Sequence, residues 1–280
     1  MQRKRVAFLR WICYYTRVMS RKGFTLIELL VVIAIIALLL SILMPALTKV
    51  KQQAKAVVCM SNLKQWAVVF GLYLQDNKSN FPLVTMATDD VYDVWVEPLR
   101  PYYKGGGEEM RMCPTATKTQ DEGARGWFIA WDKTWSNPLI NPEEDFRSSY
   151  GINNWVYNCP DKFWWNMESK YSWRRGDVKG GNRIPLFMDC FRWGGSPKDT
   201  DLPCTDPPQT TEESNNACNV FGGMNRFCLD RHNGNINMLF VDLSAGKMPL
   251  KDMWKLKWST HFNSNNDQTR EDAYWPAWIK

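Results

Sequence analysis

The most prominent feature of the hydropathy pattern is an apolar run near the start of the chain. Residues 24–47 contain a single charged side chain, Glu28, and a single proline, Pro45. As an α-helix this run would be about 36 Å long, enough to cross the roughly 30 Å hydrocarbon core of a membrane. It is also longer than the apolar part of a cleaved signal peptide. The pattern therefore predicts a membrane-spanning helix over residues 24–47.

Beyond this run the chain becomes amphipathic but keeps a helical spacing. Its apolar residues recur mostly three, four or seven positions apart, which is typical of one face of a helix. They are Leu47, Val50, Ala54, Val57, Leu63, Ala67, Phe70 and Leu74. The polar segment 76–80 and Pro82 then end the pattern. We expect one long helix over residues 24–76, whose amphipathic part, 48–76, carries a folded domain.

Residues 77–280 are long enough to form a domain with its own core. Strand-like apolar runs lie at residues 183–189 and 236–242, and a third at 247–250 contains Pro249, which suits an edge strand. Residues 251–258 suit a short helix, whereas 104–149 and 194–230 resemble long loops or insertions. The prediction is an α+β fold, with the long helix packed on a domain that contains an antiparallel sheet and long loops.

Charge is distributed unevenly along the chain. Residues 1–23 contain seven basic side chains and no acidic one, whereas only Lys49, Lys51 and Lys55 closely follow the apolar run. Basic residues remain preferentially on the cytoplasmic side of a membrane helix. This bias predicts a single-pass protein of the inner membrane, with a cytoplasmic N-terminus and a periplasmic or surface-exposed C-terminal domain.

The net charge of +6 belongs entirely to this basic segment. Without residues 1–23, the chain has 28 basic and 29 acidic side chains and a net charge of −1. A basic nucleic-acid-binding domain is therefore excluded as an interpretation. Met19 is an alternative start, and translation from it would leave Arg21 and Lys22 as the only basic residues before the apolar run.

Glu28 is the one charged side chain within the apolar run. A carboxylate at membrane depth costs about 2.5–3.5 kcal/mol on translocon insertion scales. Glu28 could reach the interface, or it could pair with a cation. Residues 24–48 contain no basic side chain. The nearest possible cation is an α-amino group created by cleavage before Phe24.

The segment Arg21–Leu30 resembles the N-terminal processing motif of type IV prepilins and type II secretion pseudopilins. The matching features are a basic leader that ends in Gly23, an aromatic Phe24, Glu28 four residues later, and an apolar helix with Pro45. The resemblance implies that a prepilin peptidase cuts after Gly23 and that Phe24 is N-methylated. It further implies that Glu28 pairs with the Phe24 amine of a neighbouring subunit and that Pro45 marks a kink or a melted stretch.

The rest of the chain resembles a branch of pseudopilin-like proteins whose late strand has a His, nine residues, and then Asp-Gly. His232 and Asp242 have this spacing, although Leu243 replaces the glycine. Further matching segments are Cys59–Gln65, Cys113-Pro114, Ser149–Asn153, the Trp-rich stretch ending at Trp258 and the C-terminal Trp-Pro-Ala-Trp-Ile-Lys. We expect His232 and Asp242 to form structural hydrogen bonds at the two ends of one strand.

Seven cysteines follow the leader, and disulfides are expected outside the inner membrane. Spacing alone does not decide their pairing. The family resemblance suggests Cys59 with Cys113, which would tie the long helix to the domain. Cys204 could pair with Cys218 or Cys228 across the polar insertion.

We predict no metal site from spacing. Zinc is disfavoured because the chain has no C-x-x-C and only two histidines, His232 and His261. Calcium is more plausible, since some major pseudopilins that the chain resembles bind it in a late loop. Possible oxygen ligands are Asp199, Asp201, Asp206, Glu212 and Glu213. An acidic loop without a metal remains the favoured interpretation.

The chain contains fifteen tryptophans, which could serve either the core or a binding surface. We assign most of them to the core and expect Trp164 and Trp165 to be exposed. We find no nucleophile motif and predict no enzymatic activity. The prediction is a prepilin-like subunit of a type II secretion pseudopilus or type IV pilus-like filament, whose partners are a prepilin peptidase and other pseudopilin subunits. The alternative is a membrane-anchored, Trp-rich protein that binds polysaccharide or another surface ligand.

Overall fold

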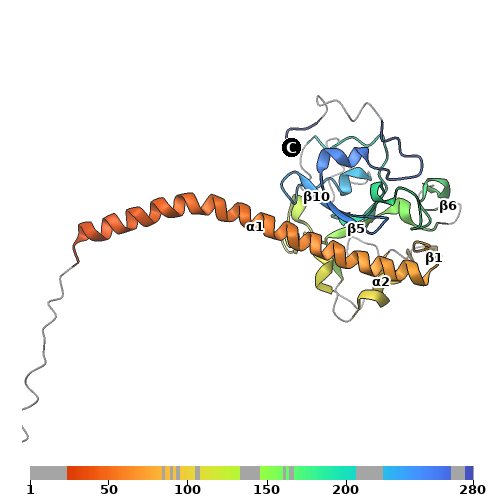
Figure 1. Cartoon of the computed structure of the whole chain (residues 1–280), viewed down its shortest axis with the longest axis horizontal. Coiled ribbons are helices and arrows are strands. Elements are labelled where there is room, and N and C mark those ends of the chain that lie inside the picture. Colours follow the sequence, from red (N-terminus) through yellow and green to blue (C-terminus); the bar gives the residue numbers. More distant parts are fainter. Residues whose placement is uncertain are drawn as a thin grey trace, which may run out of the picture. The chain divides into compact units, whose positions relative to one another are not determined.

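A computed structural model of the chain describes residues 24–83, 86–88, 91–92, 95–104, 108–132, 146–159, 162–163, 167–205, 223–265 and 275–279. The chain divides into two compact units, Met1–Lys49 and Val50–Lys280, which are treated separately below. Helix α1, Leu26–Asp76, contributes residues to both units (Figure 1). The leader, including Gly23, lies outside the described residues.

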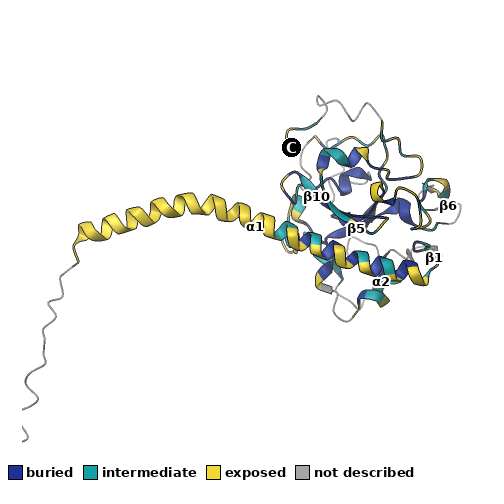
Figure 2. Ribbon diagram, viewed as in Figure 1, coloured by how far each residue is buried: buried dark blue, intermediate teal, exposed yellow. Residues whose placement is uncertain are grey.

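In the first unit, the described residues form the apolar part of α1. Every residue from Phe24 to Lys49 is exposed, as the yellow ribbon in Figure 2 shows. The predicted helix is confirmed, and it continues through Pro45 without interruption. The melted stretch expected at Pro45 is therefore not present in the structure.

The second unit combines helices with short strands, so the predicted α+β class is confirmed. Its second α-helix is α2, Val96–Tyr103. The strands are β1 Met86–Thr88, β2 Val91–Tyr92, β3 Trp131–Asp132, β4 Arg147–Ser148, β5 Tyr150–Asn153, β6 Lys162–Phe163, β7 Met167–Glu168, β8 Pro185–Asp189, β9 Gly194–Gly195, β10 Asn235–Phe240 and β11 Ala245–Pro249. The 3-10 helices are η1 Glu108–Arg111, η2 Gly126–Phe128, η3 Asn154–Val156, η4 Ser169–Tyr171, η5 Gly181–Arg183, η6 Met224–Arg226 and η7 Leu250–Lys255.

A five-stranded sheet in the order β11-β10-β8-β5-β9 forms the centre of the second unit. All its pairs are antiparallel except β5 with β9. Met188 of β8 lies opposite Met238 of β10 and Gly151 of β5. Gly151 is required by a close approach, because a Cβ there would lie 2.5 Å from the Arg192 carbonyl oxygen. The predicted strands correspond to β8, β10 and β11, and β11, which ends at Pro249, is the expected edge strand.

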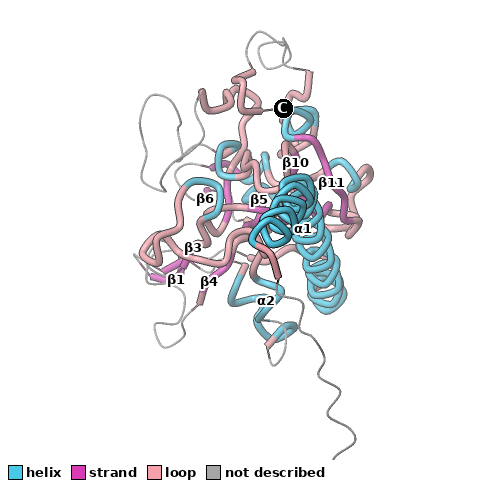
Figure 3. Tube along the Cα trace, turned by 90° about the vertical axis from the view of Figure 1, so that its left-hand side faces the viewer, coloured by secondary structure: helices cyan, strands magenta, loops and turns pink. Residues whose placement is uncertain are grey.

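One face of this sheet packs against the second part of α1, as the side view in Figure 3 illustrates. The buried residues of α1 recur three or four positions apart, so they form one helical face. They are Cys59, Asn62, Leu63, Trp66, Val69, Phe70, Tyr73 and Leu74. On the sheet side, Phe187, Leu239 and Val241 belong to the same core. The other face of the sheet is covered by a second core, in which Trp254 of η7 and Trp258 pack with Met188 and Met238.

The predicted apolar stripe of the helix is correct only in its second part. Leu63, Phe70 and Leu74 are buried and Ala67 is partly buried in the same core, as expected. The other four residues of the predicted stripe, Leu47, Val50, Ala54 and Val57, are exposed. The first buried residue of α1 is Cys59, so the apolar residues before it are not part of the core. The predicted stripe did not include Trp66, whose indole N–H is polar. This group can be buried because it donates to the Met110 carbonyl oxygen at 3.0 Å.

The turn between β10 and β11 accommodates leucine where the resembling branch has glycine. Leu243 has a φ of 65°, in the left-handed region that favours glycine. Asp242 supports this turn, because its Oδ1 accepts hydrogen bonds from Ser244 N at 3.0 Å and Ser244 Oγ at 2.6 Å. Leu243 also packs against the core, which offsets part of the backbone strain.

Candidate functional site

The beginning of α1 is capped by two of its own side chains. Thr25 donates from its backbone N and from Oγ1 to Glu28 Oε2, both at 2.8 Å, and Glu28 N donates to Thr25 Oγ1 at 3.2 Å. This reciprocal pattern is a capping box, in which a threonine and a glutamate three residues later satisfy free N–H groups. Within a single chain, Thr25 is thus the partner of the Glu28 carboxylate. Sequence reasoning missed Thr25, although the spacing Thr-x-x-Glu before an apolar run is a known helix start.

The helix that follows this cap is long and apolar enough to cross a membrane. Its most apolar 18-residue window has a mean hydropathy of 3.2, and none of that window is buried. Phe24, immediately before the cap, is 69% exposed. Contiguous exposed apolar surface of this extent is typical of contact with lipid or with other protein chains.

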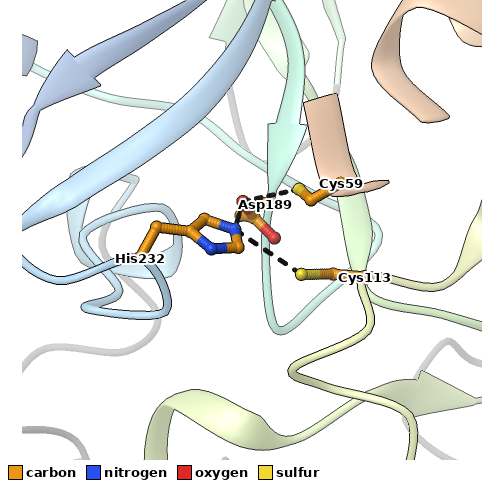
Figure 4. Close-up of side chains that lie close together, drawn as sticks. All are labelled: Cys59, Cys113, Asp189 and His232. Carbon is orange, nitrogen blue, oxygen red and sulfur yellow. Dashed lines mark hydrogen bonds and ion pairs between the residues drawn. The ribbon is translucent and has the colours of Figure 1, made fainter. Parts of the chain in front are cut away.

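A second site lies within the core of the second unit. Four buried side chains of metal-ligating type come together there, with their ligand atoms all within 4.8 Å of one another (Figure 4). We call this group the buried cluster. It consists of Cys59, Cys113, Asp189 and His232.

Four separate segments position the buried cluster. Cys59 is the first buried residue of α1, and Asp189 is the last residue of β8. Cys113 lies in the loop after η1, where its backbone N donates to Ser149 Oγ. His232 precedes β10 in a tight turn, in which Asn233 and Gly234 both have positive φ.

The contacts within the cluster are made by two neighbouring atoms, His232 Nε2 and Asp189 Oδ2. His232 Nε2 lies 3.0 Å from Asp189 Oδ2 and 3.6 Å from Cys113 Sγ. Cys59 Sγ lies 3.4 Å from the same Asp189 Oδ2. The other imidazole nitrogen of His232, Nδ1, has no hydrogen-bond partner among the described residues. The groups therefore converge on one point between Nε2 and Oδ2.

Arg231 offsets the negative charge of the Asp189 carboxylate. Its Nη1 lies 3.2 Å from Asp189 Oδ1, and both side chains are fully buried. Burial alone would raise the pKa of the Asp189 carboxyl, but the charges and hydrogen bonds of His232 and Arg231 lower that pKa to about 2. The carboxylate is therefore ionised, with Oδ1 held by Arg231 and Oδ2 directed at the cluster.

The pKa values of the three other titrating groups of the cluster are shifted by burial and by their neighbours in the cluster. Burial alone would lower the pKa of His232, but the Asp189 carboxylate and the contact with Cys113 raise it to about 10. Burial would raise the pKa of Cys113, but hydrogen bonds with Cys59 and His232 lower it to about 6. Burial raises the pKa of Cys59. Cys113 is thus the thiol that most readily becomes a thiolate.

The N-terminal site is the one for which a comparison with known proteins gives a match. Residues 18–44 match the family described as the prokaryotic N-terminal methylation motif. The N-terminal segment of the chain is of the prepilin type. This match includes Gly23, Phe24 and Glu28, and it ends one residue before Pro45. No curated protein and no solved structure matches the chain.

Several of the predictions follow from the prepilin-type motif. It supports processing of a pilin-like chain by a prepilin peptidase, and the apolar part of α1 agrees with anchoring by a single membrane helix. The matched segment ends at residue 44 and does not reach the C-terminal domain. The resemblance of that domain to the His-x9-Asp-Gly branch therefore stays a prediction.

The cysteines of the prepilin-type chain differ from the expected pairing. Cys59 and Cys113 are both free thiols, although the cluster brings their sulfurs close together. Cys204 is disulfide-bonded, whereas Cys228 is free, so the pairing of these two residues is not formed. The candidate Cys218 lies outside the described residues. The Cys59–Cys113 pairing that the family resemblance suggested is therefore not formed, whereas the disulfide bond of Cys204 agrees with the expectation that this residue is paired.

The candidate calcium ligands are only partly described. Asp201 is engaged by the backbone, since its Oδ2 accepts from Lys198 N at 3.0 Å and from Met224 N at 2.9 Å. Asp199 Oδ2 accepts from Asn263 N at 3.4 Å. The three other candidates, Asp206, Glu212 and Glu213, lie outside the described residues. Among the described residues, the buried cluster is the group suited to a metal ion.

His232 and Asp242 form hydrogen bonds at the two ends of β10, as expected, but each with a different partner. His232 contacts Asp189 and Cys113, whereas Asp242 supports the turn after β10. Their ten-residue separation reflects the length of β10 with its flanking turns. The chemically important partner of His232 is thus Asp189, whose position on another strand is invisible to local spacing.

The described tryptophans mainly serve the core. Trp66, Trp95, Trp131 and Trp258 are at most 1% exposed. Each donates its indole N–H to a backbone carbonyl oxygen, at 2.8 to 3.0 Å. The assignment of most tryptophans to the core is confirmed for these positions. Trp164 and Trp165 lie outside the described residues.

Proposed function

We propose that this prepilin-type protein is a non-enzymatic structural subunit of a pilus-like filament, such as a type II secretion pseudopilus or a type IV pilus. The subunit inserts with its N-terminus in the cytoplasm, and its C-terminal domain lies in the periplasm or at the cell surface. A prepilin peptidase cuts between Gly23 and Phe24 and methylates Phe24. The apolar part of α1 then packs against other pseudopilin subunits.

The observation that carries this proposal is the exposed apolar helix with one carboxylate near its start. All described residues up to Lys49 are exposed, so this surface needs lipid or other subunits to cover it. Among the described residues, the Glu28 carboxylate accepts hydrogen bonds only from the neutral groups of Thr25. A carboxylate in an apolar environment gains more from an opposite charge than from neutral donors. Cleavage before Phe24 creates such a charge on a neighbouring subunit.

Packing through a continuous helix surface produces an open assembly. Each subunit would present Glu28 to one neighbour and its Phe24 amine to another, which is a heterologous contact. Heterologous contacts that do not close into a ring generate helical filaments. The proposed pairing therefore explains both the register and the growth of the filament.

The alternative of a Trp-rich surface-binding protein has less support. The tryptophans that the structure describes as buried serve packing and hydrogen bonding. Trp164 and Trp165, the pair expected to be exposed, lie outside the described residues. Filament formation remains the proposed function.

Substitution of Glu28 tests the proposed pairing, and glutamine is the informative replacement. Glutamine can still close a capping box with Thr25 but has no charge. In cells with a prepilin peptidase and a filament assembly system, we expect Glu28→Gln to lower the yield of sheared filaments by about tenfold or more. The substitution leaves the charged Phe24 amine of the neighbouring subunit unpaired, and an unpaired charge in the membrane costs several kcal/mol. Thr25→Ala is the matched control, since it removes the cap but keeps the carboxylate, and should assemble normally. Normal filament yield from Glu28→Gln would contradict the pairing.

A further inference from the structure

The buried cluster has no role in the proposed assembly, yet it joins α1 to the sheet. Cys59 belongs to the helix, Asp189 to β8, and the two other members to loops around the sheet (Figure 4). Cys59 and Cys113 are 0% exposed, and so are the side chains of Asp189 and His232. We propose that the buried cluster binds one structural zinc ion, which fastens helix α1 to the C-terminal domain.

The distances within the cluster fit the edges of a zinc tetrahedron. Zinc lies about 2.3 Å from thiolate sulfur and about 2.0–2.1 Å from imidazole nitrogen or carboxylate oxygen. In a regular tetrahedron, sulfur would therefore lie roughly 3.5 Å from a nitrogen or oxygen ligand, and nitrogen roughly 3.3 Å from oxygen. The observed sulfur distances are 3.4 Å to Asp189 Oδ2 and 3.6 Å to His232 Nε2, and the nitrogen–oxygen distance is 3.0 Å. Only small movements would be needed to admit the ion.

The direction of these contacts distinguishes a metal site from a catalytic triad. In a Cys-His-Asp triad, the carboxylate binds one imidazole nitrogen and the nucleophile contacts the other. Here Asp189 Oδ2 and Cys113 Sγ both approach His232 Nε2, whereas Nδ1 has no partner among the described residues. Convergence of all donors on one point is the arrangement that a shared cation requires.

Arg231 provides the outer support that such a site needs. It holds Asp189 Oδ1 at 3.2 Å and leaves Oδ2 free to bind a metal. Groups that orient a ligand in this way are typical of metal centres. Two thiolates, one carboxylate, one zinc ion and Arg231 would together have no net charge, so the site could be fully buried without an unbalanced charge.

The donor set selects zinc. Two sulfur atoms and an imidazole disfavour magnesium and calcium, which prefer oxygen ligands. A four-coordinate site of sulfur and nitrogen donors is typical of zinc, and four protein ligands leave no open position for a substrate. The ion would accordingly have a structural task. It would also occupy the two thiols that could otherwise form the Cys59–Cys113 disulfide.

Metal analysis of the full-length protein tests this proposal. The detergent-solubilised chain is reduced, loaded with Zn²⁺, freed of excess ion and analysed for metal. We expect about one zinc ion per chain, and the loss of most of it in Cys113→Ser. Cys228→Ser is the matched control, because Cys228 is also a buried free thiol but lies outside the cluster. It should retain its zinc.

Cobalt substitution of the unmutated chain keeps the test independent of folding defects in a variant. Co²⁺ should produce the absorption bands of tetrahedral coordination with thiolate ligands, and Zn²⁺ should displace it. A chelator should also lower the melting temperature of the zinc-loaded chain, because metal binding stabilises the folded state. The absence of tetrahedral cobalt bands would overturn the proposal. Equal zinc contents in Cys113→Ser and Cys228→Ser would overturn it as well, and so would a Cys59–Cys113 disulfide that persists in the reduced, zinc-treated chain.

Discussion

Replacing Arg231 with methionine is expected to lower the free energy of unfolding by about 3–5 kcal/mol, because it removes one of the two ion-pair partners of the buried Asp189 carboxylate. Arg231 is fully buried and holds Asp189 at 3.2 Å. It also donates to four carbonyl oxygens, and methionine cannot replace any of these hydrogen bonds. The acceptors are Trp127 O, Ser149 O, Ile129 O and Cys190 O. Denaturant unfolding of the detergent-solubilised chain, with and without added zinc, measures the loss.

Arg147→Met is the matched control for this prediction. Arg147 also pairs with a carboxylate, that of Glu122 at 3.0 Å, but both side chains are partly exposed. Exposed ion pairs contribute about 0–1 kcal/mol, so this substitution should have a small effect. Equal losses in the two variants would show that burial of the Arg231–Asp189 pair is not what makes it important.

Replacing Trp66 with alanine, as a separate single substitution, is expected to lower the free energy of unfolding by about 3–5 kcal/mol. Trp66 is 0% exposed and is the point at which α1 meets the domain core. Its ring lies 5.0 Å from Phe187, 5.1 Å from Tyr103 and 5.2 Å from Trp95, measured between centroids. Alanine would leave a cavity among these rings and would deprive the Met110 carbonyl oxygen of its hydrogen bond.

Phe128→Ala provides the comparison, since Phe128 is 47% exposed. Surface substitutions of this kind usually change stability by about 0.5 kcal/mol or less. The same denaturant titration, followed by near-ultraviolet circular dichroism, should separate the two variants clearly. Coincident unfolding midpoints would contradict the assignment of Trp66 to the core between helix and sheet.

The parts of the fold with a long, regular hydrophobic pattern could be predicted from the sequence. The apolar run of residues 24–47 defines its own helix, because every position except Glu28 is compatible with lipid. The strands β8 and β10 were also recognisable, since the apolar residues along them have few polar interruptions. The position at which the buried stripe of α1 starts could not be predicted, because it depends on where the core of the domain contacts the helix. Trp66 and Asn62 are buried through hydrogen bonds to Met110 O and Met112 O, which local sequence does not reveal.

The capping box at the start of α1 and the buried cluster also differ in how far the sequence alone predicts them. Thr25 and Glu28 are three residues apart, so their capping box could have been found from the spacing alone. The members of the buried cluster are separated by 54, 76 and 43 positions, and no ligand pair has the short spacing of a zinc motif. Only the pairing of β8 with β10, together with the packing of α1 on the sheet, brings Cys59, Asp189 and His232 together. The search for C-x-x-C therefore missed a site that tertiary structure builds.

Cleavage between Gly23 and Phe24 is the event on which the proposed function depends. Its most direct test is mass spectrometry of the N-terminus of protein from cells that produce a prepilin peptidase. We expect a mature chain of residues 24–280 that begins with N-methylphenylalanine at Phe24. Replacement of Gly23 by a bulky residue should leave the leader attached. A wild-type N-terminus upstream of Phe24, unchanged by the presence of the peptidase, would contradict the proposed function.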